Sequence, residues 1–142
     1  MEAYTTGFLR ASLLWLVTGV SVGVAMAVHP AWGVYRTAHL HLMLLGFVTM
    51  MISGVAYHVF PRFAATPLFS PAMARSHLLL ANIGVAAMAL GFGWRLHDPV
   101  TGGAILGVGA TASAIGAYLL AWNLWRTLDS AALSLTRIRA RP

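Results

Sequence analysis

Four long apolar stretches, separated by short segments that contain proline, constrain this chain more than any other feature. They cover about 8–28, 32–60, 75–96 and 102–126. A helix needs about 20 apolar residues to cross the ~30 Å hydrocarbon core of a bilayer. Proline ends helices, and it stands between each stretch and the next. We therefore predict an all-α, integral membrane four-helix up-down bundle in a single transmembrane domain, followed by a basic C-terminal tail at 127–142.

Composition agrees with a membrane location and excludes several kinds of chemistry. The chain is 59% hydrophobic and only 8% charged, and a soluble domain of this size could not bury so much apolar surface. It has no cysteine, which excludes disulfides, iron–sulfur clusters and thiol catalysis. All nine basic residues are arginines. They gather at the ends of the stretches and in the tail, which is typical of membrane topology, so we expect lipid and not nucleic acid as a partner.

The distribution of the arginines predicts the orientation in the membrane. Arg36 and Arg95 fall on one side, and the other seven fall on the side of both termini. Because cytoplasmic loops carry the excess of positive charge, we expect a multi-pass protein of the cytoplasmic (inner) membrane with both termini in the cytoplasm. We expect the first stretch to be a retained helix. The tail 127–142 is expected to lie along the anionic inner surface or to be disordered.

Two histidines, His39 and His41, stand near the start of the second stretch. Their spacing directs them roughly 200° apart on a helix. An imidazole without a partner is costly in hydrocarbon. Metal ligation in two directions satisfies both rings, and haem iron is the most frequent such metal; plain hydrogen bonding is the alternative. Arg36, one turn before His39, is placed either to bind a haem propionate or to anchor the helix end.

The other four histidines and two glycine motifs are less specific. We expect His29 and His97 to be interfacial polar residues. His58 and His77 are expected to lie at the headgroup level of the opposite side, and pairing of the two across the loop between the second and third stretches is the alternative; the sequence assigns none of the four a role. Small residues four apart allow helices to approach closely, within or between protomers. Two such motifs are present, and they are Gly19-x-x-x-Gly23 and Gly103-x-x-x-Gly107.

The second stretch resembles a helix of a known family. It opens with Ala38-His39-Leu40-His41 and closes with Tyr57-His58-Val59-Phe60-Pro61. This arrangement resembles the tenth helix of the catalytic subunit of haem-copper oxidases, whose two histidines ligate the high-spin and the low-spin haem. With Arg36 included, it is also similar to the second helix of nitric oxide reductases and cbb3-type oxidases. The resemblance implies haem b as cofactor, His39 and His41 as axial ligands of the haem iron, and Arg36 beside the cofactor.

The resemblance also implies an assembly. The family's catalytic core has twelve helices in three four-helix arcs, so a four-helix chain that resembles one arc implies a homotrimer. His39 of one protomer would then face His41 of its neighbour across a haem. The histidines that hold the family's second metal have no counterpart in this sequence. The resemblance therefore does not extend to the reduction of oxygen or nitric oxide.

These observations lead to three functional hypotheses. The first is a bis-histidine haem b protein at subunit interfaces, with a role in electron transfer or in redox or gas chemistry in respiration or denitrification. Quinol or a respiratory subunit would be its partner. The second is a non-catalytic accessory or scaffold subunit of a respiratory complex. The third is a nitric oxide or oxygen sensor with an open haem position, and an optical spectrum distinguishes the three.

Overall fold

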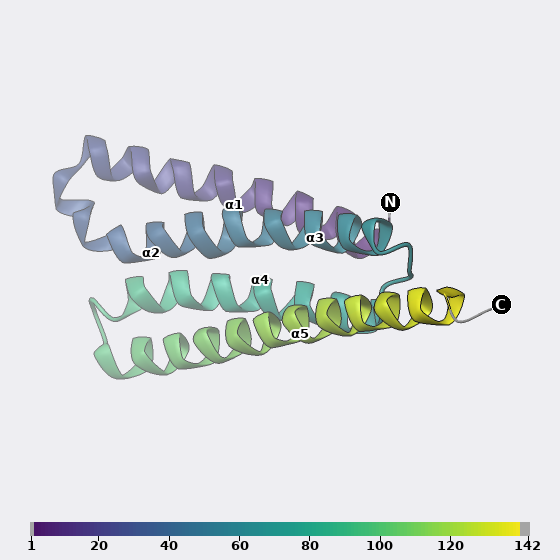
Figure 1. Ribbon diagram of the computed structural model, residues 1–142. Coiled ribbons are helices and arrows are strands. Elements are labelled where there is room, and N and C mark those ends of the chain that lie inside the picture. The colour runs from purple at the N-terminus through teal and green to yellow at the C-terminus, as the bar shows by residue number, and fades with distance from the viewer. Residues whose placement is uncertain (1, 140–142) are drawn as a thin grey trace.

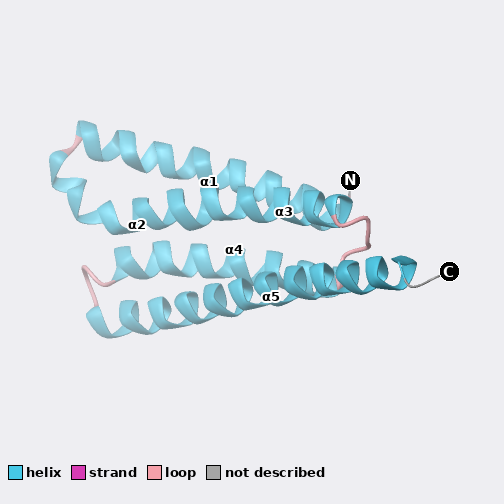
Figure 2. Ribbon diagram, in the orientation of Figure 1, coloured by secondary structure: helices cyan, strands magenta, loops and turns pink. Residues whose placement is uncertain are grey.

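Helices account for all regular structure in the part of the chain that the structure describes. The computed structural model describes residues 2–139, with the side chains of residues 2–133. Figure 2 shows helices joined by short loops. Four helical segments are long and apolar enough to cross a membrane, and these are Ala3–Val28, Pro30–Phe63, Pro71–Trp94 and Pro99–Leu133. This confirms the predicted all-α class and its four spans.

The four spans form two hairpins that lie side by side (Figure 1). Helix α1 (Ala3–Val28) packs against the second span, and α4 (Pro71–Trp94) packs along α5 (Pro99–Arg139). The tips of both hairpins lie at one end of the bundle, which we call the hairpin end. The N-terminus and the loop between the second and third spans lie at the other end, which we call the terminal end.

The second span changes its winding along its length. It begins as a 3₁₀ helix, η1 (Pro30–Tyr35), and continues as α2 (Arg36–His41). A π-helical segment, η2 (Leu42–Thr49), follows and leads into α3 (Met50–Phe63). Helical structure therefore starts at Pro30, which suits a first turn because proline has no N–H to leave unpaired. Since π-helical segments are rare and occur frequently at functional sites, the position of η2 directly after the histidine pair is notable.

Glycines bring the backbones of α4 and α5 into contact. An ideal Cβ on Gly84 would lie 2.9 Å from the carbonyl oxygen of Gly109, and one on Gly109 would lie 2.8 Å from the nitrogen of Met88. Any larger residue would separate the helices. Gly103 and Gly107, which form the glycine motif of this helix, have open space around them instead. The contact face of α5 is therefore adjacent to the face that the motif marks.

Helix α5 is longer than the predicted fourth helix. It runs without a break from Pro99 to Arg139, so 41 residues span about 62 Å at 1.5 Å per residue. Residues 127–139 contain no glycine or proline that would end it. Figure 1 shows this yellow segment projecting past the bundle at the terminal end. Most of the predicted tail is thus a continuation of α5, and residues 140–142 lie outside the described residues.

Two buried side chains of α5 hold the loop that precedes α4. Ser70 N donates a hydrogen bond to Asn123 Oδ1 at 2.9 Å, and Asn123 Nδ2 donates to the Ser70 carbonyl oxygen at 2.8 Å. Phe69 N donates to Thr127 Oγ1 at 3.0 Å. Asn123 and Thr127 are fully buried. These bonds satisfy backbone groups that a loop inside an apolar bundle would otherwise leave unpaired.

Candidate functional site

His39 lies on α2 and turns toward α1. Its Nδ1 donates a hydrogen bond to the carbonyl oxygen of Gly19 at 2.9 Å. Gly23, one turn further along α1, makes room for the ring, because an ideal Cβ there would lie 3.0 Å from His39 Cε1. A carbonyl oxygen only accepts hydrogen bonds, so this bond assigns the proton to Nδ1. Nε2 therefore keeps its lone pair for a further ligand.

His41 makes the same kind of bond within its own helix. Its Nδ1 donates to the carbonyl oxygen of Thr37 at 2.9 Å. Its ring packs against Phe92 of α4 with the centroids 4.7 Å apart. Both His39 and His41 are half-buried, and neither Nε2 has a hydrogen-bond partner among residues 2–133. Both imidazoles therefore carry their proton on Nδ1, and in both rings Nε2 is the nitrogen available to a ligand.

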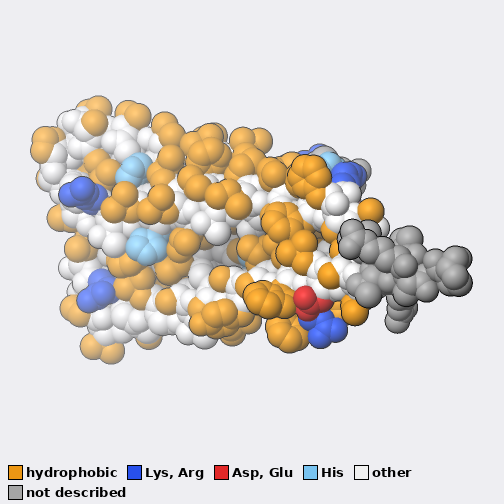
Figure 3. Space-filling model, in the orientation of Figure 1, with side chains coloured by type: hydrophobic (Ala, Val, Ile, Leu, Met, Phe, Trp, Pro, Cys, Tyr) orange, Lys and Arg blue, Asp and Glu red, His pale blue; other side chains and the backbone are white. Residues whose placement is uncertain are grey.

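The two rings diverge on either side of α2. Ala38 and Leu42 form the buried face of this segment, with exposed fractions of 7% and 3%. His39 leaves that face toward α1, and His41 leaves it toward α4. Because the helix lies between the two rings, one chain cannot place them on opposite sides of one planar ligand. Figure 3 shows histidine surface among hydrophobic side chains toward the hairpin end, so this region reaches the outside of the bundle.

Arg36 and a group of aromatic residues lie next to the pair. Arg36 begins α2 and is exposed, and no ion pair or hydrogen bond occupies its guanidinium within the described side chains. A mainly apolar pocket of about 420 Å³ opens between the second span and α4. Its lining includes Trp32, Tyr35 and Trp94. The predicted site residues therefore share one end of the bundle, beside an aromatic pocket.

Three of the other histidines lie at the surface or half-buried near the ends of the bundle. The His29 ring packs on Trp32 with the centroids 5.7 Å apart, and His97 is exposed in the turn before α5. His58 lies at the terminal end, where its Nδ1 accepts a hydrogen bond from Arg62 Nη1 at 2.9 Å. None of them approaches the His39 and His41 pair closely enough to form a metal-binding cluster. Within the described residues no three histidine, aspartate or glutamate side chains come together in such a group.

His77 differs from the expectation that it lies at headgroup level. It is only 3% exposed and is enclosed between helices. Its Nδ1 shares a hydrogen bond of 3.1 Å with the hydroxyl of Tyr57, and its ring lies 4.7 Å from that of Phe8. The prediction was wrong because distance along the chain gives the depth of a residue but not which face of its helix is covered. Tyr57 on the second span supplies the polar partner that makes burial possible.

The structure has four apolar helices, and the second one carries a divergent pair of half-buried histidines. These features define a multi-pass membrane protein with two imidazoles available to a ligand. The family described as Cytochrome C and Quinol oxidase polypeptide I matches residues 4–137. The chain therefore belongs to this family, the haem-copper oxidase subunit I family, as its second helix predicted. Proteins of this family bind haem. No curated protein matches the chain.

Proposed function

We propose that this chain is an electron-transfer protein of the cytoplasmic membrane that binds haem b between protomers. His39 of one protomer and His41 of its neighbour would be the axial ligands. The observation that carries the proposal is the shared geometry of the two rings, in which Nδ1 donates to a backbone carbonyl and Nε2 is free. Histidines that ligate metals commonly donate their second ring N–H in this way. Bound haem would supply one-electron redox chemistry.

The divergence of the two rings favours a site made by two chains. Each protomer has one ring on each flank of α2, so each would contribute His39 to one site and His41 to the next. A closed ring of protomers satisfies every histidine, and the three four-helix arcs of the family favour a homotrimer. Arg36 would stand beside the site with a free guanidinium, which suits a charge-assisted bond to a propionate.

The neighbouring residues suit a site of this kind. The carbonyl oxygens of Gly19 and Thr37 fix the orientation of the two rings. Histidines on both axial positions would leave no open position for a gas, which favours electron transfer over oxygen or nitric oxide chemistry. Quinol or a respiratory subunit is the proposed redox partner.

An optical spectrum of the purified full-length chain tests this function. We expect a reduced-minus-oxidised spectrum of six-coordinate haem b, with one haem for each chain in a trimer. His39→Ala and His41→Ala should each abolish this spectrum. His58→Ala is the matched control, because His58 lies at the other end of the bundle, and it should keep the haem content of the wild type.

Two other results would overturn the proposal and favour the alternatives. A protein that lacks haem after expression with ample haem supply, and that co-purifies with larger respiratory subunits, would be an accessory or scaffold subunit. A reduced spectrum that shifts on addition of carbon monoxide would indicate an open position, as a nitric oxide or oxygen sensor requires.

A labelling experiment tests whether both termini are cytoplasmic. Cysteines are introduced beyond each end of the bundle, and their accessibility to a membrane-impermeant reagent is measured.

A further inference from the structure

The pocket of about 420 Å³ at the hairpin end, which we call the aromatic pocket, has three large aromatic residues in its wall. Trp32 and Tyr35 belong to η1 at the start of the second span, and Trp94 is the last residue of α4. The rings of Trp32 and Tyr35 meet edge to face, with the centroids 6.1 Å apart and an angle of 78° between the planes. Two faces of the wall therefore stand nearly perpendicular to each other.

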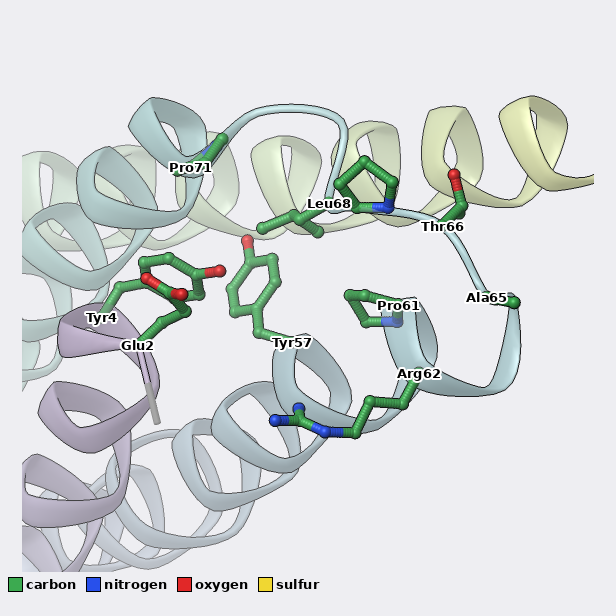
Figure 4. A pocket seen from close by; sticks show the side chains of 10 residues that line it. Glu2, Tyr4, Tyr57, Pro61, Arg62, Ala65, Thr66, Leu68 and Pro71 are labelled. Carbon is green, nitrogen blue, oxygen red and sulfur yellow. The ribbon is translucent and has the colours of Figure 1, made fainter.

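The rings of the aromatic pocket are accessible to a ligand. Trp32 and Trp94 are 48% and 53% exposed, and Tyr35 is half-buried. The pocket at the terminal end differs in this respect. Figure 4 shows Tyr4 and Tyr57 among the residues that line it, but these side chains are only 6% and 2% exposed. Of these two pockets, the aromatic pocket is therefore the one that presents open ring faces.

The aromatic pocket becomes aliphatic with depth. Leu42 follows Tyr35 by seven residues and so lies about 10 Å further into the bundle along the second span. Val22 of α1 and Leu90 of α4 contribute to the same wall. Aromatic rings suit the level where polar headgroups meet hydrocarbon, and aliphatic side chains suit the acyl chains below. The lining therefore matches an amphiphile that points its polar group outward.

The charges in and around the aromatic pocket fit a group that carries both signs. Its lining, all of it within the described residues, contains no aspartate or glutamate. The faces of the rings and the C-terminal end of α4 both carry partial negative charge, so they attract a cation. Arg95 follows Trp94 directly and is exposed, and no ion pair or hydrogen bond occupies its guanidinium within the described side chains. It is free to pair with an anion at the edge of the pocket.

We propose that the aromatic pocket binds the headgroup of phosphatidylcholine. The trimethylammonium group would lie against the open faces of Trp32, Tyr35 and Trp94, because cation–π attraction recognises quaternary ammonium ions. The phosphate would pair with Arg95, and an acyl chain would follow the aliphatic wall. This binding does not involve His39, His41 or Arg36, so it does not depend on the proposed haem site.

The lining distinguishes choline from the other common headgroups. The primary ammonium of phosphatidylethanolamine has three N–H groups that each need an acceptor. The side chains that line the pocket offer the Tyr35 hydroxyl and the His97 ring as acceptors, since tryptophan only donates. A trimethylammonium group has no N–H and needs none. Phosphatidylglycerol has no cation to place against the rings.

Native mass spectrometry of the full-length chain in a maltoside detergent tests the proposal. The chain is offered equal amounts of phosphatidylcholine, phosphatidylethanolamine, phosphatidylglycerol and a quinone. We expect it to retain phosphatidylcholine in preference to the other three. Trp32→Leu removes one ring and should lower the affinity for phosphatidylcholine by roughly two- to thirtyfold. Tyr35→Phe keeps the ring face and should bind like the wild type.

Trp125→Leu is the matched control, because Trp125 is an exposed aromatic residue of α5 in the other half of the bundle. It should retain phosphatidylcholine like the wild type. Haem adds a different mass from a lipid, so loss of haem and loss of lipid are read separately, and failure of one proposal does not entail failure of the other.

Several outcomes would overturn the proposal. They are a chain that retains no lipid, equal retention of phosphatidylcholine and phosphatidylethanolamine, and preferential retention of phosphatidylglycerol or the quinone. A Trp32→Leu variant with the wild-type affinity for phosphatidylcholine also contradicts it. If Trp32→Leu does not fold, Trp94→Leu serves instead, because it removes another exposed ring of the same wall. Weaker binding in that variant supports the proposal, and unchanged binding overturns it.

Discussion

At the scale of single residues, the position of His39 depends on a glycine of the neighbouring helix. Any side chain on Gly23 would press on the His39 ring, whose Cε1 lies 3.0 Å from an ideal Cβ. We therefore expect Gly23→Val to displace His39 from the Gly19 carbonyl and to lower the haem content of the purified protein. Ala27→Val, on an exposed position of the same helix, is the control and should bind haem normally. Equal haem content in the two variants would contradict this account.

Sequence reasoning reached some of these residues and not others. The i, i+2 spacing of His39 and His41 is sufficient to predict rings that diverge, because it depends only on helix geometry. The glycine motif predicted that α1 approaches another helix closely, and Gly19 and Gly23 do contact His39. The motif did not predict that His39 of the second span would be the residue in contact. The burial of His77 could not be predicted, since it depends on the rotation of α4 relative to Tyr57. The predicted haem ligation of His39, His41 and Arg36 stays a prediction.

At the scale of elements, Asp98 caps the start of α5 outside the membrane spans. Its Oδ1 accepts hydrogen bonds from Val100 N at 3.0 Å and Thr101 N at 3.2 Å, and its Oδ2 accepts one from the Thr101 hydroxyl. These bonds, above all that from the Thr101 hydroxyl, lower the pKa of Asp98 below its ordinary value of 3.8. Such a cap stabilises the fold above the ordinary pKa, and the stabilisation is lost as pH falls through the lower folded pKa.

Asp98→Ala should therefore lower the apparent Tm at neutral pH. The difference in Tm between variant and wild type should narrow as the pH falls below 3.8, because the Asp98 carboxylate of the wild type then becomes protonated. Thermal unfolding followed by circular dichroism in detergent measures both effects. Asp129→Ala, at an exposed position in the C-terminal part of α5, is the control. A Tm difference between Asp98→Ala and wild type that stays constant with pH would contradict the role of the charged carboxylate.

The pairing of α4 with α5 depends on particular glycines. In Gly84→Ala the new Cβ would clash with Ser113 Oγ and would lie 2.9 Å from the Gly109 carbonyl oxygen, so the helices must separate. We expect a loss of about 1–3 kcal/mol in the free energy of unfolding, typical of overpacking. Gly93→Ala is the control on the same helix, because its Cβ would meet Tyr35 at an ordinary 3.7 Å. It should be neutral or stabilising by up to about 1 kcal/mol through helix propensity. Denaturant titration in mixed micelles compares the two variants, and equal stabilities would contradict the packing argument.

Hydropathy predicted which segments are helices because lipid leaves a spanning backbone few alternatives to a helix. It did not predict the π-helical winding of Leu42–Thr49, which depends on how the second span packs between α1 and α4. Nor did it predict that α5 continues to Arg139, since residues 127–139 have no break signal but are too polar to be read as a span. The second glycine motif lies on α5, which does pack closely against α4. The motif does not lie on the face of α5 that contacts α4.

At the scale of the whole molecule, the two ends of the bundle carry different chemistry. The hairpin end has the half-buried His39 and His41 pair, whose rings lie on either side of α2. The terminal end has the enclosed pair of Tyr57 and His77, which is complete within one chain. The proposed site takes one half-buried imidazole from each of two protomers, so the oligomer is part of that proposed site. Haem binding should therefore depend on the contact between protomers.

Mixing two inactive variants tests this dependence. His39→Ala and His41→Ala each lack one ligand at every interface, so a homomeric assembly of either should bind no bis-histidine haem. When the two variants are co-expressed in equal amounts, some interfaces form between a His41→Ala protomer and a His39→Ala protomer. At such an interface the first protomer supplies His39 and the second supplies His41. Random mixing leaves such a complete interface at about a quarter of positions in a closed ring. Purification through two different affinity tags keeps only mixed assemblies, and every mixed trimer has one complete interface out of three. Haem quantified for each chain should therefore return to about a third of the wild-type value. Co-assembled chains without haem would show that one protomer provides both ligands or that neither binds iron.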